Sequence, residues 1–242
     1  MFDAVVNHAS ASSQYFQRFL NEEEGYAHYF VEGNPTLDYS KVVRPRTSPL
    51  LTPFDKKTHR TWVWTTFSAD QVDFNFREPA VLIEMLDILL FYVHHKARYI
   101  RLDAVGLLWK ELGTSCMHLP ETHEIIKLMR YVIRLFTNTH LVTETNVPHL
   151  ENISYFGNGY DEASMVYQFP LPPLTLHTFL TGNAKHMNAW LNTLKLESDQ
   201  TTFFNFLSSH DGIGMRPVDG LLSAEEKEYL VNHTIERGGR IN

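Results

Sequence analysis

The sequence is poor in cysteine and in positive charge, and each shortage excludes a class of protein. Its single cysteine, Cys116, cannot form a disulfide within the chain, which argues for a reducing compartment. The formal net charge is −7, with 21 Lys and Arg against 28 Asp and Glu, so no basic stripe is available to bind nucleic acid. We therefore expect a cytoplasmic protein with no nucleic-acid partner.

Long hydrophobic runs are also missing. The most apolar stretch, residues 80–93, contains Glu84 and Asp87 and is too short to span a bilayer. The first residues, from Met1 to Asp3, lack the basic and apolar regions of a signal peptide. What remains is ordinary for a globular protein, because 43% of the 242 residues are hydrophobic and 20% are charged. This length suits one large domain or two small ones, and we expect no membrane partner.

The apolar pattern predicts an alternation of strands and helices. Strands are expected over residues 2–8, 99–105, 140–146, 164–169 and 201–211. Helices are expected over residues 79–97, 121–137, 184–194 and 223–239, with Pro79 in a first turn and Ser223 as an N-cap. Such alternation predicts an α/β fold whose parallel strands have right-handed crossovers, in a sheet that is either open or closed into a barrel.

Residues 9–78 do not fit this alternation. The gap between the first strand and the strand at 99–105 is too long for one strand–helix unit, so we expect an inserted segment there. The segment is rich in proline and aromatic residues, among them Pro35, Pro45, Pro49, Pro53, Tyr39, Phe54, Trp62, Trp64 and Phe67.

Polar residues gather at the carboxyl ends of the expected strands. Asn7 and His8 end the first strand, Asp103 and Glu144 end the next two, and His210 with Asp211 ends the last. In α/β folds, ligands bind at the carboxyl ends of the strands, and barrel enzymes place their active sites on that face. This distribution predicts an enzyme.

Arg101 and Asp103 are the most informative pair. They lie two residues apart in a strand, so their side chains point to the same side of the sheet. Even a buried ion pair roughly breaks even in free energy, so stability alone does not explain the two charges. A cation beside a carboxylate favours its ionised form, which is the form that attacks as a nucleophile. We therefore interpret the pair as a catalytic device.

Three carboxylates at three strand ends, together with one arginine and two histidines, suit glycosyl transfer. One carboxylate attacks or stabilises the anomeric carbon, while a second, protonated carboxyl delivers its proton to the leaving oxygen.

Four segments of the sequence resemble the conserved segments of the α-amylase clan. They are DAVVNH, RLDAV, TETN and SSHD, in that order. The flanking stretches VVRPRTSPLLTPF, QVDFNF, RLDAVGLLWKELGTSC, FPLPPLTLHTF and HDGIGMRP are similar to the sucrose phosphorylase subfamily. TETNVPHLENISYFGNG resembles most closely its glucosylglycerate phosphorylase members. The resemblance covers essentially the whole chain.

This resemblance implies an α-amylase-type (β/α)8 barrel. Residues 1–8 and 79–242 would form part of the barrel, and residues 9–78 would be a small inserted domain B after strand 3. The expected strands correspond to barrel strands 3–7, so the sequence is expected to be partial. A barrel missing strands has open edges, and one alternative is therefore an inactive fragment.

The resemblance also implies a role for each site residue. Asp103 would be the nucleophile, Glu144 the general acid and base, and Asp211 the residue that stabilises the transition state. The residues implied to contact the glucosyl ring are His8, Arg101 and His210, with Asn7 supporting His8. Arg44 would recognise phosphate, and Gln71 would line the acceptor side.

By the same resemblance, the reaction retains the anomeric configuration and passes glucose from an α-glucoside to inorganic phosphate. No metal or organic cofactor is implied. The leaving group stays open among fructose, a sugar phosphate and glycerate, and an α-glucosidase-type hydrolase is the alternative activity. Other interpretations also stay open: Asp103 and Glu144 in structural salt bridges, His8 as a core histidine, and Arg44 with Arg46 as a solvated loop pair.

Overall fold

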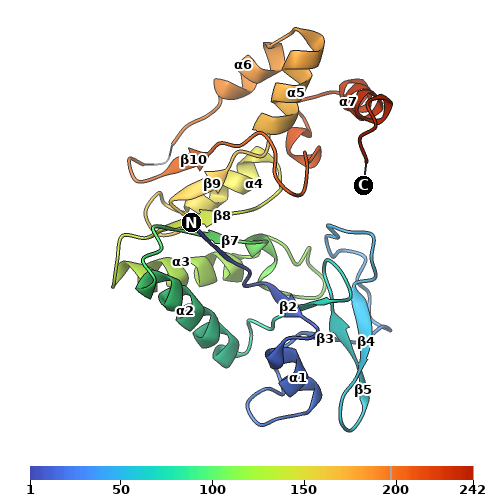
Figure 1. Cartoon of the computed structure of the whole chain (residues 1–242), viewed down its shortest axis with the longest axis vertical. Coiled ribbons are helices and arrows are strands. Elements are labelled where there is room, and N and C mark those ends of the chain that lie inside the picture. Colours follow the sequence, from blue (N-terminus) through green and yellow to red (C-terminus); the bar gives the residue numbers. More distant parts are fainter. Residues whose placement is uncertain (197, 242) are drawn as a thin grey trace. The chain divides into compact units, whose positions relative to one another are not determined.

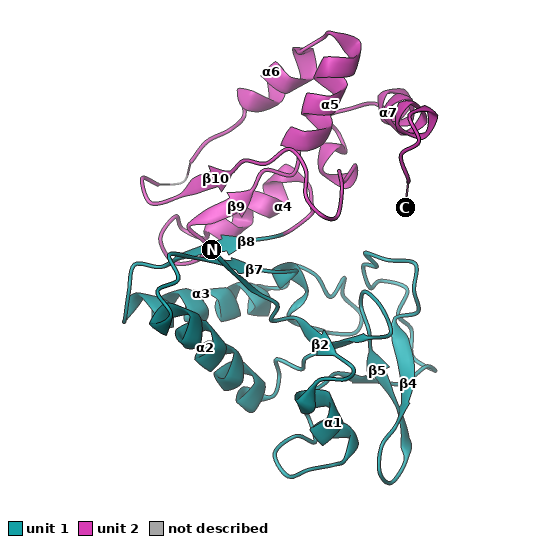
Figure 2. Ribbon diagram, viewed as in Figure 1, with its two compact units in different colours: residues 1–144 teal, residues 145–242 magenta. Residues whose placement is uncertain are grey.

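A computed structural model describes residues 1–196 and 198–241. The chain divides into two compact units, residues 1–144 and residues 145–242 (Figure 2). The order of their elements along the chain can be followed in Figure 1.

The first unit contains three parallel strands in the spatial order β1 (Phe2–Ala4), β7 (Tyr99–Leu102) and β8 (His140–Thr143). In their register Asp3 lies opposite Arg101, and Arg101 lies opposite Val142. Most side chains of β7 and β8 are buried, as expected for strands of a parallel sheet.

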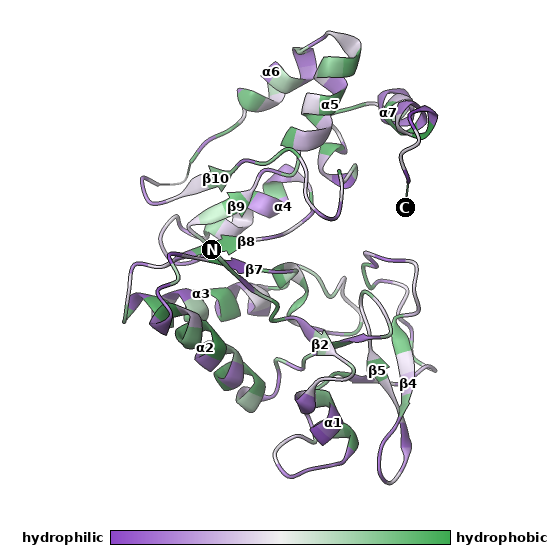
Figure 3. Ribbon diagram, in the orientation of Figure 1, coloured by the Kyte–Doolittle hydropathy of each residue, from purple (hydrophilic) through white to green (hydrophobic). Residues whose placement is uncertain are grey.

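Two helices accompany these strands, α2 (Pro79–His94) and α3 (Pro120–Arg134), and they pack on each other. Each begins with a proline in its first turn, where the missing N–H costs nothing. In α2 the buried residues are Val81, Met85 and Leu89, one turn apart on one face. Figure 3 shows the mixture of apolar and hydrophilic residues along this helix. The predicted helices 79–97 and 121–137 are therefore confirmed within a few residues.

The segment between β1 and α2 contains antiparallel strands and one short helix. Strand β2 (His8–Ser10) pairs with β6 (Gln71–Asp73), and β3 (Glu32–Gly33), β5 (Arg60–Trp64) and β4 (Leu51–Asp55) form a small sheet in that order. Helix α1 (Gln14–Leu20) begins at Ser13, whose side chain accepts a hydrogen bond from the backbone N–H of Phe16. Phe16 and Phe19 are buried in an aromatic core with Phe30, Phe54 and Phe74.

The second unit contains the parallel strand pair β9 (Met165–Tyr167) and β10 (Thr202–Phe204). Its helices are α4 (His149–Ile153), α5 (Leu171–Thr181), α6 (Lys185–Leu191) and α7 (Ala224–Glu236). Three short 3₁₀ turns complete the regular structure of the described residues. One lies in the first unit, at Val105–Leu107, and two lie in the second unit, at Ser154–Phe156 and Arg216–Val218.

Two predictions for the second unit have different outcomes, and one of its helices is not predicted. The helix predicted over 223–239 is confirmed as α7, with Ser223 as its N-cap and a reciprocal hydrogen bond from Glu226. Helix α5 is not predicted by the apolar pattern. The strand predicted over 201–211 is wrong beyond residue 204, because β10 ends at Phe204. Phe206 instead packs against the rings of Tyr167 and Phe169.

Candidate active site

The three parallel strands of the first unit bring three carboxylates to one guanidinium. Arg101 Nη1 donates hydrogen bonds to Asp3 Oδ1 at 2.7 Å and to Asp103 Oδ1 at 2.8 Å. Arg101 Nη2 lies 3.9 Å from Glu144 Oε2. We call these four residues, Asp3, Arg101, Asp103 and Glu144, the Arg101 cluster. The predicted proximity of Arg101 to Asp103 and Glu144 is therefore observed, and Asp3 joins them through the register of β1 and β7.

Burial differs among the members of the Arg101 cluster. The side chain of Arg101 is 9% exposed, whereas those of Asp103 and Glu144 are 23% and 16% exposed. Burial would lower the pKa of the Arg101 guanidinium, but the hydrogen bond to Asp3 and the charges of Glu144 and Asp103 outweigh it and raise this pKa above its ordinary value. Arg101 is therefore a permanent cation, and both carboxylates that flank it still reach solvent.

The backbone is strained directly after Asp103. Ala104 has φ 48° and ψ 31°, a left-handed conformation that a residue with a Cβ adopts only at a cost of about 1 to 3 kcal/mol. This turn aims the backbone N–H of Ala104 at Glu144, whose Oε2 accepts its hydrogen bond at 3.1 Å. The strained residue Ala104, two positions after the end of β7, thus orients the Glu144 carboxylate.

His8 and Gln71 lie on the neighbouring antiparallel pair, β2 and β6. Their Nε2 atoms are 2.9 Å apart, and His8 is 8% exposed. Burial lowers the pKa of His8, the charges of Asp73 and Asp103 oppose that shift, and the charge of Lys110 adds to it. The lowered pKa favours the neutral imidazole of His8, which can both donate and accept a hydrogen bond.

A buried ion pair supports this region, and sequence reasoning misses both of its members. Lys110 Nζ lies 2.9 Å from Asp73 Oδ2, with the two side chains 5% and 0% exposed. Lys110 Nζ also donates to Asn7 Oδ1 at 2.8 Å, and Thr66 donates through its N–H and its hydroxyl to Asp73. Asn7, which precedes His8 in the sequence, thus belongs to a fully buried polar network. The only sequence signal for Lys110 is a lone cation in the apolar stretch GLLWKELG.

We expect Lys110→Ala to lower the free energy of unfolding by about 3 to 5 kcal/mol, because it leaves the Asp73 carboxylate buried without its cation. Lys127 is the matched control, since its pair with Glu124 has side chains 36% and 71% exposed, and Lys127→Ala should cost no more than about 1 kcal/mol. Urea unfolding followed by circular dichroism measures both. Equal losses for the two variants would contradict this account.

The contact of Arg44 is with its own loop. It is exposed in a loop, and its guanidinium donates a hydrogen bond to the backbone carbonyl of Ser48. None of its contacts with described residues is with a member of the Arg101 cluster. The structure therefore shows Arg44 as an exposed arginine whose guanidinium is held by one backbone carbonyl.

His210 and Asp211 belong to the second unit. They lie in the loop that follows β10, and the side chains are 77% and 50% exposed. The Nε2 atom of His210 lies 3.4 Å from Asp211 Oδ2, and the backbone N–H of Asp211 donates to Ser209 Oγ at 3.2 Å. The expectation that these two residues directly end a strand is wrong, because the chain leaves β10 at Phe204.

The family of the chain follows from comparison with known proteins. Residues 1–217 match the family model described as alpha amylase, catalytic domain. The chain belongs to this alpha-amylase family, which confirms the resemblance of its four short segments.

Within this family, the chain is similar to curated glucosylglycerate phosphorylases. The chain is 55% identical to a glucosylglycerate phosphorylase of Allomeiothermus silvanus and 52% identical to one of Escherichia coli, over its full length in both cases. It spans 44% of the length of each of these relatives. The predicted similarity to glucosylglycerate phosphorylases is thus confirmed.

A solved structure supports the fold class. The crystal structure of sucrose 6F-phosphate phosphorylase from Thermoanaerobacter thermosaccharolyticum superposes with a TM-score of 0.86 at 25% identity, over 99% of this chain and 50% of that one. The parallel strands thus belong to an α-amylase-type barrel, of which this chain supplies a part.

Among the described residues, no helix combines the length and the apolar character that crossing a membrane requires.

Proposed function

We propose that the chain is the catalytic part of a retaining glycoside phosphorylase, which transfers glucose from an α-glucoside to phosphate and yields α-glucose 1-phosphate. The observation that carries the proposal is the Arg101 cluster, in which one guanidinium contacts two carboxylates at the ends of neighbouring strands. The relatives, named glucosylglycerate phosphorylases, support phosphate as the co-substrate. Glucosylglycerate and sucrose are the candidate glucosides, and no metal or organic cofactor enters the proposed reaction.

The proposed reaction has two displacements. In the first, an Asp103 oxygen attacks the anomeric carbon, the glycosidic C–O bond breaks, and Glu144 donates its proton to the leaving oxygen. In the second, the ionised Glu144 takes a proton from phosphate while a phosphate oxygen attacks the anomeric carbon and the bond to Asp103 breaks. Two inversions restore the α configuration. Retaining enzymes hold the two carboxyl groups about 5 to 5.5 Å apart, and contact with one shared guanidinium is compatible with this separation.

The other site residues have supporting roles in this proposal. Asp211 binds the sugar hydroxyls in the transition state, and His8, Arg101 and His210 contact the glucosyl ring. Gln71 lines the acceptor side, next to His8. The cytoplasmic location predicted from the sparse use of cysteine also stays a prediction, and Cys116 is a buried free thiol.

The activity is best tested in a chimera, because the chain spans less than half of its relatives. In this chimera, residues 1–242 replace the matching segment of the Escherichia coli glucosylglycerate phosphorylase, which is 52% identical. We expect glycerate to be released from glucosylglycerate only when phosphate is present. Equal release with and without phosphate would favour the α-glucosidase-type hydrolase instead.

We expect Glu144→Gln in the chimera to lower kcat by about 10² to 10⁴-fold for a natural glucoside, because the amide cannot protonate the leaving oxygen. An aryl glucoside with an acidic phenol leaves without that proton, so its glucosyl transfer to the enzyme should be affected much less. Pre-steady-state release of the phenol measures this step. Equal losses for both substrates would rule out Glu144 as the general acid.

We expect Arg44→Ala to raise the KM for phosphate at least about tenfold more than the KM for the glucoside, because a guanidinium fork matches phosphate oxygens. Arg46→Ala is the matched control, since it removes a charge from the same loop. Initial rates at varied phosphate and at varied glucoside separate the two constants. Equal changes in both constants for Arg44→Ala would remove the phosphate role.

A further inference from the structure

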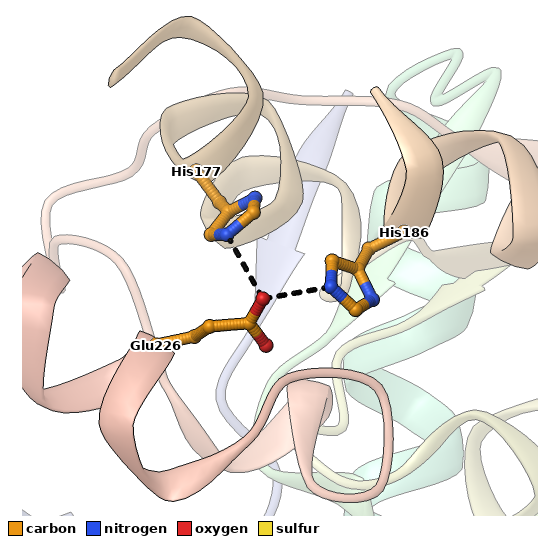
Figure 4. A group of neighbouring side chains, drawn as sticks. All are labelled: His177, His186 and Glu226. Carbon is orange, nitrogen blue, oxygen red and sulfur yellow. Dashed lines mark hydrogen bonds and ion pairs between the residues drawn. The ribbon is translucent and has the colours of Figure 1, made fainter. Parts of the chain in front are cut away.

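Three potential metal ligands converge in the second unit, and none of them has a role in the proposed reaction. His177 lies on α5, His186 on α6 and Glu226 in the first turn of α7. Figure 4 shows both imidazole rings turned toward the Glu226 carboxylate. Glu226 Oε1 lies 2.8 Å from His186 Nε2 and 3.5 Å from His177 Nε2.

His177 is the member of this group that its surroundings satisfy least. Its side chain is 3% exposed, and its Nδ1 has no hydrogen-bond partner among the described residues. Its Nε2 meets Glu226 at 3.5 Å, which is an ion-pair distance and too long for a good hydrogen bond. A ligand on Nε2 would replace this long contact with a direct bond, while Nδ1 would stay without a partner among the described residues.

Glu226 presents a carboxylate oxygen that is not used elsewhere. Its Oε2 accepts a hydrogen bond from the Ser223 N–H at 2.8 Å, as part of the capping box of α7. Among the described residues, its ion-pair partners are the two histidines, with no Lys or Arg. The anion at Oε1 therefore lacks a permanent cation.

Two imidazole nitrogens and one carboxylate oxygen are a donor set that zinc prefers. The ligand atoms of the three side chains all lie within 4.8 Å of one another. Around a tetrahedral zinc, with bonds of about 2.0 to 2.2 Å, ligand atoms lie about 3.3 Å apart, so small rotations of the side chains suffice. We propose that His177, His186 and Glu226 form a Zn²⁺ site with its fourth position open to water.

Such a site would fasten three helices to one another. The same helices and the turn before α7 share an apolar core of Leu174, Trp190, Val218, Leu222 and Leu230. A metal bound only by the folded state adds its binding free energy to the stability of that state. The site is therefore structural in its effect, and it leaves the chemistry of the Arg101 cluster unchanged.

The alternative is a hydrogen-bonded cluster without metal, and the two differ at the Nε2 atoms. In a hydrogen-bonded cluster the Nε2 atoms carry protons that point at Glu226, whereas at a zinc site they carry lone pairs that point at the metal. Zinc binding must then release protons, and its affinity must fall as the pH is lowered.

The test measures Zn²⁺ binding to the chimera by competition with a chromophoric chelator, with the unaltered Escherichia coli enzyme measured alongside. We expect one zinc per chain, with affinity reduced at least about 100-fold by His186→Ala and by Glu226→Gln. Glu226→Gln keeps the helix cap, since glutamine serves equally in a capping box. His233→Ala is the control, because His233 lies on α7 outside the group.

A second measurement needs no variant. X-ray absorption at the zinc edge of the zinc-loaded chimera should show two imidazole ligands, with oxygen atoms completing the coordination. Absence of zinc binding, unchanged affinity in both ligand variants, or a spectrum with another number of imidazoles would each overturn the proposal.

Discussion

Asp103→Asn should reduce the turnover of the chimera by at least about 10³-fold, which corresponds to about 4 kcal/mol of transition-state stabilisation. An amide does not attack an anomeric carbon, so the first displacement has no nucleophile. The substitution is nearly isosteric, and Arg101 keeps its hydrogen bond to Asp3. Folding should therefore be unchanged. Initial rates with glucosylglycerate and phosphate measure the loss, and thermal unfolding checks the fold.

Asp3 provides the matched control for this substitution. Its Oδ1 accepts from the same Arg101 Nη1 that binds Asp103, at 2.7 Å and 2.8 Å respectively. Asp3 lies within β1, however, whereas Asp103 follows the end of β7. Asp3→Asn should therefore disturb only the position of Arg101 and cost far less activity. Comparable losses for the two variants would mean that the carboxylates act through Arg101, and that Asp103 is not the nucleophile.

The 242-residue chain on its own should show no measurable phosphorolysis and should bind a hydrophobic dye. The chimera should catalyse phosphorolysis and should not bind the dye. In the first unit, β1 is an edge strand of the parallel sheet. Large apolar side chains are also exposed on α2, on α3 and just after α3: Ile83, Phe91, Tyr131, Leu135 and Phe136. We expect these exposed apolar side chains, together with the edge strand, to pack against the barrel segments that the chimera supplies.

The expected loss of activity follows from geometry. A displacement of one ångström in a catalytic group costs about 100-fold in rate, and the groups proposed here come from several strands and loops. An open sheet edge does not hold them to that tolerance. Coupled phosphorolysis assays and dye fluorescence on the two proteins test this directly. A cooperatively unfolding 242-residue chain with measurable glucosyl transfer would show that its strands suffice for activity.

The strand ends were the part of the site that could be predicted from the sequence. Asp103 and Glu144 follow apolar runs that read as buried strands, and parallel strands end at one edge. Asp3 could not be assigned in this way. Its contact with Arg101 depends on the register of β1 against β7, which pairs residues 98 positions apart.

Long-range polar pairing also explains the missed support of the site. Lys110 and Asp73 lie in separate apolar stretches, and each looks like an isolated surface charge until the fold buries both. Their hydrogen bonds to Asn7 and Thr66 satisfy the charges, and no local pattern indicates them. The same limit applies to His177, His186 and Glu226, which three separate helices bring together.

Local structure was predicted best where a helix had both periodicity and a cap. The Ser223 cap and the Pro79 first turn are chemical signals that tertiary packing does not override. Helix α5 carries no comparable signal in the sequence, because it has no side-chain N-cap hydrogen bond and begins with Pro172 and Pro173, although proline is tolerated in a first helical turn. The strand over 201–211 was overextended because alternating phenylalanines continue past the last backbone pairing at Phe204.

The central claim is that the protein transfers glucose to phosphate with retention, and the configuration of the first product tests it most directly. The measurement is a proton NMR time course of the chimera acting on glucosylglycerate in phosphate buffer, in which the phosphate on the anomeric oxygen keeps the configuration of the product fixed. The account predicts α-glucose 1-phosphate as the first product, formed in step with glycerate. The β anomer, or free glucose released at the same rate with and without phosphate, would contradict it.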